Sequence, residues 1–285
     1  MPIVTLKDME RLSPLFKGKA GNAFAKTILR ITGAGKIVDL HERCYTGQSG
    51  PEFADAILKD VGVDYLVGHA ERLASMATGP FITVSNHIYG HIDGIMLVDL
   101  FGHIRKEYKV MVNEMLAHIR AMSPSFINVV PKGAEDTGPK AASLGGVRET
   151  LGRLRDGFPV GFFPAGAVSD LSLKDRCIRD RAWQQPILRL IQKARVPIVP
   201  VRFFDRNSLY YYSLGLIDWK VRILRLCGEV FNKRGKTIRL GIGETISPEQ
   251  QAACPDTDAL GAFLRKSVYE MPLPESFISR SDIKL

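Results

Sequence analysis

The chain has 285 residues, of which 45% are hydrophobic and 24% charged, and its formal net charge is +9. These proportions are typical of a globular protein and exclude a disordered or fibrous one. Its apolar runs, such as residues 196–201, fall far short of the ~20 residues that cross a bilayer, and the N-terminal MPIVTLKDMERL lacks the apolar segment of a secretory signal. We therefore expect a cytoplasmic protein, bound at most to the surface of a membrane.

Hydrophobic periodicity predicts alternating helices and strands along the chain. In chain order, helices are expected within 1–45 and over 51–61, 94–101, 144–156, 183–194 and 257–271, and strands over 64–67, 81–85, 108–112, 126–130, 159–163, 196–203 and 237–242. The first helical pattern rests on Phe24, Ile28 and Ile31 and is broken by Gly33 and Gly35. The alternation predicts an α/β fold with a mostly parallel central sheet flanked by helices. We expect residues 1–60 to form a helical N-terminal cap and residues 61–285 the main domain, most simply as one structural unit.

A histidine-rich run, SNHIYGHIDG, follows the predicted strand over residues 81–85. It places His87, His91 and Asp93 close together, and these are plausible zinc ligands. The run faintly resembles the histidine–aspartate loop of the metallo-β-lactamase fold. However, that loop has a further histidine where this chain has Gly94, and no histidine follows His118. A zinc site is one interpretation of the run, and a polar surface turn is another.

General-base catalysis is the third interpretation. Histidine has an ordinary pKa of ~6.5, and a carboxylate on its far ring nitrogen fixes the tautomer and stabilises the charged ring. His87 and Asp93 are six residues apart, so they cannot share a face of one straight helix. Gly90 permits a turn that brings them together, while His91 is a rival partner for Asp93. A loop at the carboxyl end of a strand is also where α/β folds commonly bind ligands.

Four blocks in order resemble the glycerolipid acyltransferase superfamily, which includes the 1-acylglycerol-3-phosphate acyltransferases. The first is the run from Asn86 to Gly94, with five residues between His and Asp instead of the usual four, as in the hemolysin-like branch related to acyltransferases of ornithine and glycine lipids. The second block is Phe162-Phe163-Pro164-Ala165-Gly166. The third is Asp180-Arg181-Ala182-Trp183, which is followed by the strand over 196–201. The fourth is Asp205-Arg206-Asn207-Ser208. The resemblance as a whole covers roughly residues 60–245.

The resemblance implies an O-acyltransferase that moves a fatty acyl group from a thioester to the hydroxyl of a lyso-lipid. His87 would remove the hydroxyl proton and Asp93 would orient His87. The donor would be acyl carrier protein or coenzyme A, with no metal and no other cofactor. The implied substrate-binding residues are Asn86, Gly90, Phe163, Pro164, Ala165, Gly166, Asn207 and Ser208.

Departures from the family pattern bear on the acceptor. Ala165 and Val168 stand where the usual FPEGTRS block has the glutamate and arginine that help to hold a phosphate, and Ala167 replaces a frequent acidic residue. Lys132 is the only cation near the second block, whose pattern is not clear here. We therefore expect a lyso-aminolipid acceptor. The alternatives are a lysophosphatidic acid acyltransferase, a non-catalytic lipid-binding relative and a zinc-dependent hydrolase.

Aromatic and basic residues over 209–227 suggest a contact with anionic headgroups on the inner face of the cytoplasmic membrane. We expect this contact, or one with the donor, to involve Tyr211, Trp219, Arg222, Arg225, Arg176 and Arg179. The segment could equally be a buried aromatic strand with a solvated basic flank, and Arg176 and Arg179 could belong to a solvated loop. No zinc finger or RNA-binding aromatic motif is present, so we expect no nucleic-acid partner. The four separated cysteines predict free thiols.

Overall fold

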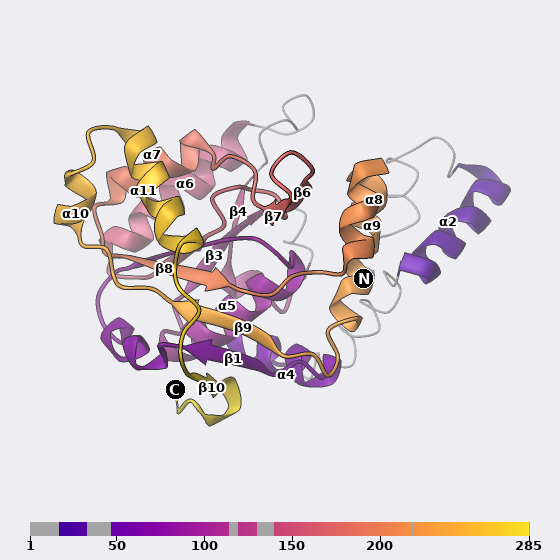
Figure 1. The fold of residues 1–285 in the computed structure, drawn as a ribbon, viewed down its shortest axis with the longest axis horizontal. Coiled ribbons are helices and arrows are strands. Elements are labelled where there is room, and N and C mark those ends of the chain that lie inside the picture. Colours follow the sequence, from indigo (N-terminus) through magenta and orange to yellow (C-terminus); the bar gives the residue numbers. More distant parts are fainter. Residues whose placement is uncertain (1–16, 33–46, 114–118, 130–139, 218, 285) are drawn as a thin grey trace.

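The computed structural model describes residues 17–32, 47–113, 119–129, 140–217 and 219–284 (Figure 1). Its helices are α2 (Gly18–Thr32), α4 (Pro51–Val61), α5 (His91–Ile104), α6 (Lys140–Arg155), α7 (Gln185–Ala194), α8 (Leu209–Ile217), α9 (Trp219–Phe231), α10 (Pro248–Ala252) and α11 (Thr257–Tyr269). Its strands are β1 (Tyr65–Gly68), β2 (Ile82–Ser85), β3 (Lys109–Asn113), β4 (Phe126–Val129), β5 (Val160–Phe162), β6 (Asp170–Ser172), β7 (Cys177–Arg179), β8 (Ile198–Phe203), β9 (Ile238–Ile242) and β10 (Phe277–Ser279). Short 3₁₀ turns occupy Ala70–Met76, Ser123–Ser125 and Arg280–Asp282.

Eight of these strands form one sheet in the order β10-β1-β9-β8-β2-β5-β3-β4. From β8 to β4 every neighbouring pair is parallel, whereas β9 runs antiparallel to β8 and β10 antiparallel to β1. The predicted mostly parallel sheet flanked by helices is therefore confirmed. Because the central strands are parallel, their carboxyl ends share one edge, and the loop after β2 opens there.

Both faces of the sheet are covered, as the continuous apolar runs of the central strands require. On one face α4 and α5 pack against the sheet, and on the other face lie α6, α7 and α11 (Figure 1). In strand β8, successive side chains point to opposite faces of the sheet. Val199 and Val201 belong to the core under α4 and α5, whereas Ile198 belongs to the core under α7 and α11. Helix α4 is thus part of the main core.

Most predicted elements lie within a few residues of the observed ones. Residues 209–227 form the helices α8 and α9, so the alternative of a buried aromatic strand is wrong. These two helices pack against each other, and α2 contacts α9 beside them (Figure 1). The side chains of Phe24, Ile28 and Ile31, together with residues 1–16 and 33–46, lie outside the described part of the structure, so the N-terminal cap stays a prediction. None of the helices in the described ranges is long and apolar enough to cross a membrane.

Candidate active site

The loop between β2 and α5 carries the histidine run, and Asn86 fixes its start. The Asn86 Nδ2 donates to the Phe203 carbonyl at 2.9 Å, and the Asn86 Oδ1 accepts from the Phe203 N–H at 2.8 Å. This reciprocal pair joins the carboxyl ends of β2 and β8. Asn86 is buried and both of its polar atoms are bonded to backbone, so it holds the loop in place. The predicted substrate contact of Asn86 stays a prediction.

Gly90 turns the chain back so that Asp93 meets His87. Its φ of 80° and ψ of −101° lie in a region that only glycine enters readily, and it caps the amino end of α5. The His87 Nδ1 lies 3.0 Å from the Asp93 Oδ2. This oxygen also accepts the backbone N–H groups of Tyr89 at 3.0 Å and Gly90 at 3.1 Å, and Oδ1 accepts that of Gly94 at 2.8 Å. The fully buried Asp93 carboxylate therefore completes the helix cap and orients His87.

The electrostatics of His87 favour a strong base. Burial of the ring lowers its pKa, but the Asp93 charge and hydrogen bond, with a further contribution from Asp180, more than offset this effect and leave the pKa raised above its ordinary value. The side chain keeps 19% of its surface exposed. Because Nδ1 faces Asp93, Nε2 is the nitrogen available to a substrate. The arrangement can therefore take a proton from a bound hydroxyl group.

Two alternatives to the His87–Asp93 pair were a partnership of His91 with Asp93 and a metal site. His87, and not His91, is the histidine bonded to Asp93. Burial lowers the pKa of His91, and the neighbouring His87 acts in the same direction. Within the described ranges, no three His, Cys, Asp or Glu side chains are close enough to hold a metal ion.

A second carboxylate, Asp180, lies beneath the loop. Its Oδ1 accepts the His87 N–H at 3.1 Å and the Ser169 hydroxyl at 2.6 Å, and its Oδ2 accepts the Trp183 Nε1–H at 3.4 Å. Burial raises the pKa of this carboxyl group. Sequence reasoning recognised the block that begins at Asp180 but gave the residue no role. Asp180 holds the backbone of His87 and adds negative charge near its ring.

The Phe163–Gly166 block borders His87 on the side of β5. The Phe163 ring centroid lies 4.2 Å from that of His87, and its side chain is partly exposed. Gly166 has a φ of 65° and is exposed, and a Cβ there would come within 2.0 Å of the Gln184 Nε2. Phe163 and Gly166 therefore lie where a substrate could contact them.

Pro164 and Ala165 differ from these two residues because both are buried. Their carbonyl groups accept the Gln184 backbone N–H at 2.9 Å and the Gln184 Nε2 at 3.1 Å, respectively. They fix the turn in this way, and their predicted role in binding substrate stays a prediction.

Asn207 and Ser208 connect the loop between β2 and α5, called the catalytic loop below, to α8 and α9. The buried Asn207 Nδ2 donates to the carbonyl groups of Ile88 at 3.2 Å and Tyr89 at 3.4 Å. Ser208 donates through its hydroxyl to Glu229 at 2.8 Å. Asn207 therefore supports the loop and Ser208 is tied to α9, while their predicted place in the substrate site stays a prediction.

The residues predicted to contact membrane or donor divide into two groups. Tyr211 and Arg222 are buried, with the Arg222 guanidinium bonded to Asp170 and lying 5.5 Å from the Tyr211 ring centroid. Since neither reaches the surface, the prediction is wrong for these two. The remaining four are exposed or partly exposed: Trp219, Arg225, Arg176 and Arg179.

A family model described as Acyltransferase matches residues 13–273. The chain belongs to this acyltransferase family. All four blocks on which the resemblance depended lie inside the match, including the His87–Asp93 pair. The structure brings His87 and Asp93 of the first block into contact.

Two curated relatives of the acyltransferase are bacterial. A lyso-glycine lipid O-acyltransferase of Bacteroides thetaiotaomicron is 30% identical over 59% of this chain and 61% of its own length. A lyso-glycine lipid O-acyltransferase of Phocaeicola vulgatus is 27% identical over 66% of this chain and 67% of its own length. The match thus spans about three fifths of the length of the first relative and two thirds of the length of the second. Among solved structures, the 1-acyl-sn-glycerophosphate (LPA) acyltransferase PlsC of Thermotoga maritima aligns over 93% of this chain and 95% of its own, with 15% identity and a TM-score of 0.45.

Proposed function

We propose that this acyltransferase moves a fatty acyl group from a thioester to the hydroxyl of a lyso-aminolipid. The observation that carries the proposal is the contact between His87 Nδ1 and Asp93 Oδ2 at the carboxyl end of β2. It leaves Nε2 to act on a substrate beside Phe163 and Gly166. General-base catalysis of this kind contributes roughly 100- to 10,000-fold to rate.

The proposed reaction is a direct transfer with no acyl-enzyme. His87 Nε2 takes the proton of the acceptor hydroxyl while its oxygen attacks the thioester carbonyl carbon. The new C–O bond forms, the C–S bond breaks, and the thiolate that leaves receives the proton from the His87 imidazolium. Asp93 stabilises the imidazolium between the two proton transfers.

The choice of acceptor rests on two supports. Ala165 and Val168 replace the residues of the family block that help to hold a phosphate, so this chain lacks that clamp. The two curated relatives act, by name, on lyso-glycine lipid. The donor is acyl carrier protein or coenzyme A, for which the exposed Arg176 offers positive charge, whereas Arg179 is ion-paired to Asp175.

We place the reaction at the inner face of the cytoplasmic membrane, with α8 and α9 as the contact. Six large apolar side chains on this pair are 48–82% exposed: Leu209, Tyr210, Leu216, Ile217, Trp219 and Ile223. Exposed apolar groups gathered in this way are typical of an interaction surface. The pair is tied to the catalytic loop, since the Tyr212 hydroxyl donates to the Ile88 carbonyl at 3.1 Å. Docking through α8 and α9 would therefore hold the loop close to the bilayer.

The test is thiol release from acyl carrier protein and from acyl-CoA, with lyso-glycine lipid, lyso-ornithine lipid, lysophosphatidic acid or no acceptor. We expect release that requires a lyso-aminolipid and falls by roughly 100- to 10,000-fold in His87→Ala. His69→Asn is the matched control, because His69 lies outside the site at a φ of 57° that asparagine tolerates. Release at the wild-type rate by folded His87→Ala would overturn the proposed base. Release with lysophosphatidic acid alone would overturn the proposed acceptor.

A further inference from the structure

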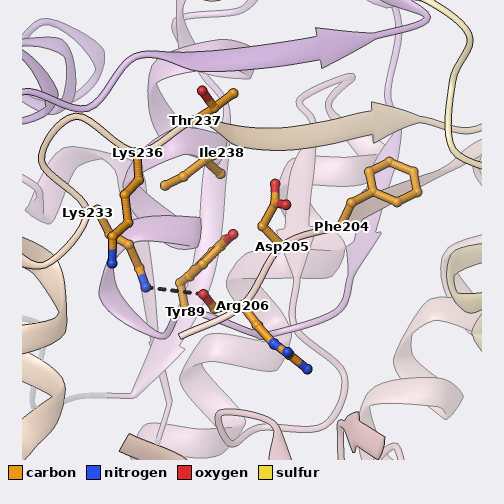
Figure 2. A pocket seen from close by; sticks show the side chains of 8 residues that line it. All are labelled: Tyr89, Phe204, Asp205, Arg206, Lys233, Lys236, Thr237 and Ile238. Atoms are coloured by element: carbon orange, nitrogen blue, oxygen red, sulfur yellow. Dashed lines mark hydrogen bonds between the residues drawn. The ribbon is translucent and has the colours of Figure 1, made fainter. Parts of the chain in front are cut away.

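A cavity of about 540 Å³ lies between the end of β8 and the start of β9 (Figure 2). It is lined by Tyr89, Phe204, Asp205, Arg206, Lys233, Lys236, Thr237 and Ile238. It shares the sheet edge of the catalytic loop, because β9, β8 and β2 are neighbours in that order and the amino end of β9 faces the carboxyl end of β8. Two strand spacings, about 10 Å, separate β2 from β9. The reaction proposed above uses none of the side chains that line this cavity.

Positive charge dominates the cavity. The carboxylate of Asp205 is neutralised by Arg239, whose Nε lies 3.2 Å from it and whose backbone N–H donates to it at 2.8 Å. By contrast, no carboxylate among the described residues lies within ion-pair distance of Lys236 or Arg206. The lining therefore presents a net positive field to any ligand that enters.

Lys233 is the unusual cation among them. Its side chain is only 3% exposed, and its Nζ donates to the Arg206 carbonyl at 3.3 Å and lies 3.6 Å from the Glu229 carboxylate. Figure 2 shows Lys233 and Lys236 entering the cavity from the same side. Burial lowers the pKa of Lys233 to about 8; the Lys236 charge acts in the same direction, and the Glu229 and Asp205 charges oppose it. The Lys236 charge acts on Lys233 as a like charge, and an anion near both groups would offset that repulsion.

Tyr89 supplies an independent sign of a ligand. Its side chain is 2% exposed, and its hydroxyl oxygen is buried with no hydrogen-bond partner in the described part of the chain. In Figure 2 this hydroxyl points into the space between Asp205 and Ile238. The Lys233 Nζ lies 4.9 Å from the centroid of the same ring. Because an unpaired buried hydroxyl is costly, a donor left in this position favours a ligand oxygen that would accept from it.

We propose that this cavity binds an oxyanion, either a carboxylate or a phosphate group, between the ammonium groups of Lys233 and Lys236 and the hydroxyl of Tyr89. The lining supplies the required chemistry, namely charged and neutral donors around a space large enough for such a group. An oxyanion there would also offset the repulsion between the two lysines. The inference does not depend on the proposed acyl transfer, because it is tested by binding alone.

The site is connected to the catalytic loop through Tyr89. The ring of this residue lines the cavity, while its backbone N–H donates to the Asp93 Oδ2 that faces His87. A ligand bonded to the Tyr89 hydroxyl would thus contact a residue of the loop that carries His87 and Asp93. Two chemical sources suit the site, the carboxylate of an amino-acid headgroup and the phosphates of a coenzyme A donor.

The experiment measures direct binding by isothermal titration calorimetry near neutral pH at constant ionic strength. The probes are inorganic phosphate, coenzyme A against pantetheine, and a short-chain N-acylglycine against its methyl ester. Tyr89→Phe and Lys236→Ala are the test variants. Removing the Tyr89 hydroxyl deletes only a group that has no protein partner among the described residues, so this variant is expected to fold.

A matched control comes from another basic cavity, of about 590 Å³, lined in part by Arg148, Arg155 and Lys193. Lys193→Ala removes a cation from that cavity and leaves the proposed site intact. We expect both test variants to weaken binding of the preferred probe by about tenfold or more, and Lys193→Ala to leave it unchanged.

The pattern of probes assigns the source. Tighter binding of coenzyme A than of pantetheine would identify donor phosphates, and tighter binding of N-acylglycine than of its ester would identify an acceptor carboxylate. Binding of inorganic phosphate alone would support a free anion as the ligand. The proposal is overturned if no probe binds the wild type, or if the folded test variants bind every probe as tightly as the wild type does.

Discussion

The Asp93 Oδ2 that lies 3.0 Å from the His87 Nδ1 also accepts the N–H groups of Tyr89 and Gly90. One oxygen therefore closes the turn and orients the histidine. The carboxylate cannot rotate away from His87 without losing backbone bonds at the start of α5. Helix capping and proton chemistry are thus carried by the same side chain, and a change at Asp93 is expected to affect both.

The first prediction concerns the pH dependence of acyl transfer. The base must be neutral to accept a proton, so kcat/KM should rise with pH through the pKa of His87. Since Asp93 and Asp180 raise that pKa, the inflection should lie above the ordinary histidine value of ~6.5. In Asp93→Asn the residual activity should be lower by roughly 100- to 10,000-fold, and its inflection should move to lower pH.

Asp55→Asn is the control for this measurement, because it removes a carboxylate that is ion-paired to Lys59 on α4, away from the loop. Its profile should match that of the wild type. An Asp93→Asn profile with the wild-type inflection would contradict the orienting role of Asp93. The free energy of unfolding offers a second check on the direction of the His87 pKa shift. Because the pKa of His87 is raised in the folded state, its protonation stabilises the fold below about pH 6.5, and this contribution is lost as the pH rises through the folded-state pKa.

The second prediction separates structure from charge at Asp180. Asp180→Ala leaves the His87 N–H and the Trp183 Nε1–H without their acceptor, and should lower the free energy of unfolding by about 2–4 kcal/mol. Asp180→Asn keeps one acceptor oxygen but removes the charge. We expect Asp180→Asn to fold, to lower kcat by roughly tenfold with little change in KM, and to shift the pH inflection downward. A merely structural role would leave the inflection of the folded variant in place.

Local sequence patterns predicted most of the helices and strands correctly. The helix predicted over residues 51–61 matches α4 residue for residue, and the predicted strands overlap the observed ones. The prediction that Gly90 would turn the chain and bring Asp93 to His87 is confirmed by the contact itself. These features depend on residues within one turn or one strand of each other, where periodicity and glycine conformation are decisive.

What the sequence did not reveal depends on long-range contacts. Asp180 is 93 residues from His87, and only the folded chain brings its carboxylate under the loop. Asn86 and Asn207 resemble substrate ligands in the sequence, but each is bonded to backbone more than 100 residues away. The aromatic run over 209–227 has strand-like composition, yet it folds as α8 and α9. Burial of Tyr211 and Arg222 in that pair is a tertiary effect that local propensity does not encode.

The third prediction uses two glycines with similar φ and different surroundings. Gly90 has a φ of 80° and a Cβ at this position would lie 2.8 Å from the Leu226 Cδ2, whereas Gly79 has a φ of 75° with nothing within 4 Å of such a Cβ. Gly79→Ala therefore reports the cost of a positive φ without a clash, whereas Gly90 also has a ψ of −101° that alanine rarely adopts. Gly90→Ala adds a clash and should cost about 1–3 kcal/mol more in the free energy of unfolding.

Urea denaturation of both variants measures this difference, and thiol release measures its effect on the site. Because Gly90 forms the turn that brings Asp93 to His87 and the added Cβ would crowd Leu226, Gly90→Ala should also lower kcat, while Gly79→Ala should leave kcat unchanged. Equal stability losses in the two variants would contradict close packing of α9 against the catalytic loop.

The fourth prediction tests α8 and α9 as the membrane contact. Ile217 is 82% exposed at the end of α8, so Ile217→Asp should fold normally and weaken binding to vesicles that contain anionic phospholipid by roughly tenfold or more. Co-sedimentation with vesicles of anionic and of purely zwitterionic lipid measures the effect. The exposed Lys19 and Lys26 belong to α2, which contacts α9, so the wild type should prefer the anionic vesicles.

Leu273→Asp is the matched control, since Leu273 is also exposed, at 53%, but follows α11, away from α8 and α9. The same apolar-to-acidic change there should leave vesicle binding unchanged, because the effect depends on position and not on net charge. Equal loss in both variants would indicate a non-specific charge effect and would contradict the assignment of α8 and α9. A loss confined to Ile217→Asp, with thiol release from a water-soluble short-chain acceptor retained, would separate docking from chemistry and place the contact on the helix pair that supports the catalytic loop.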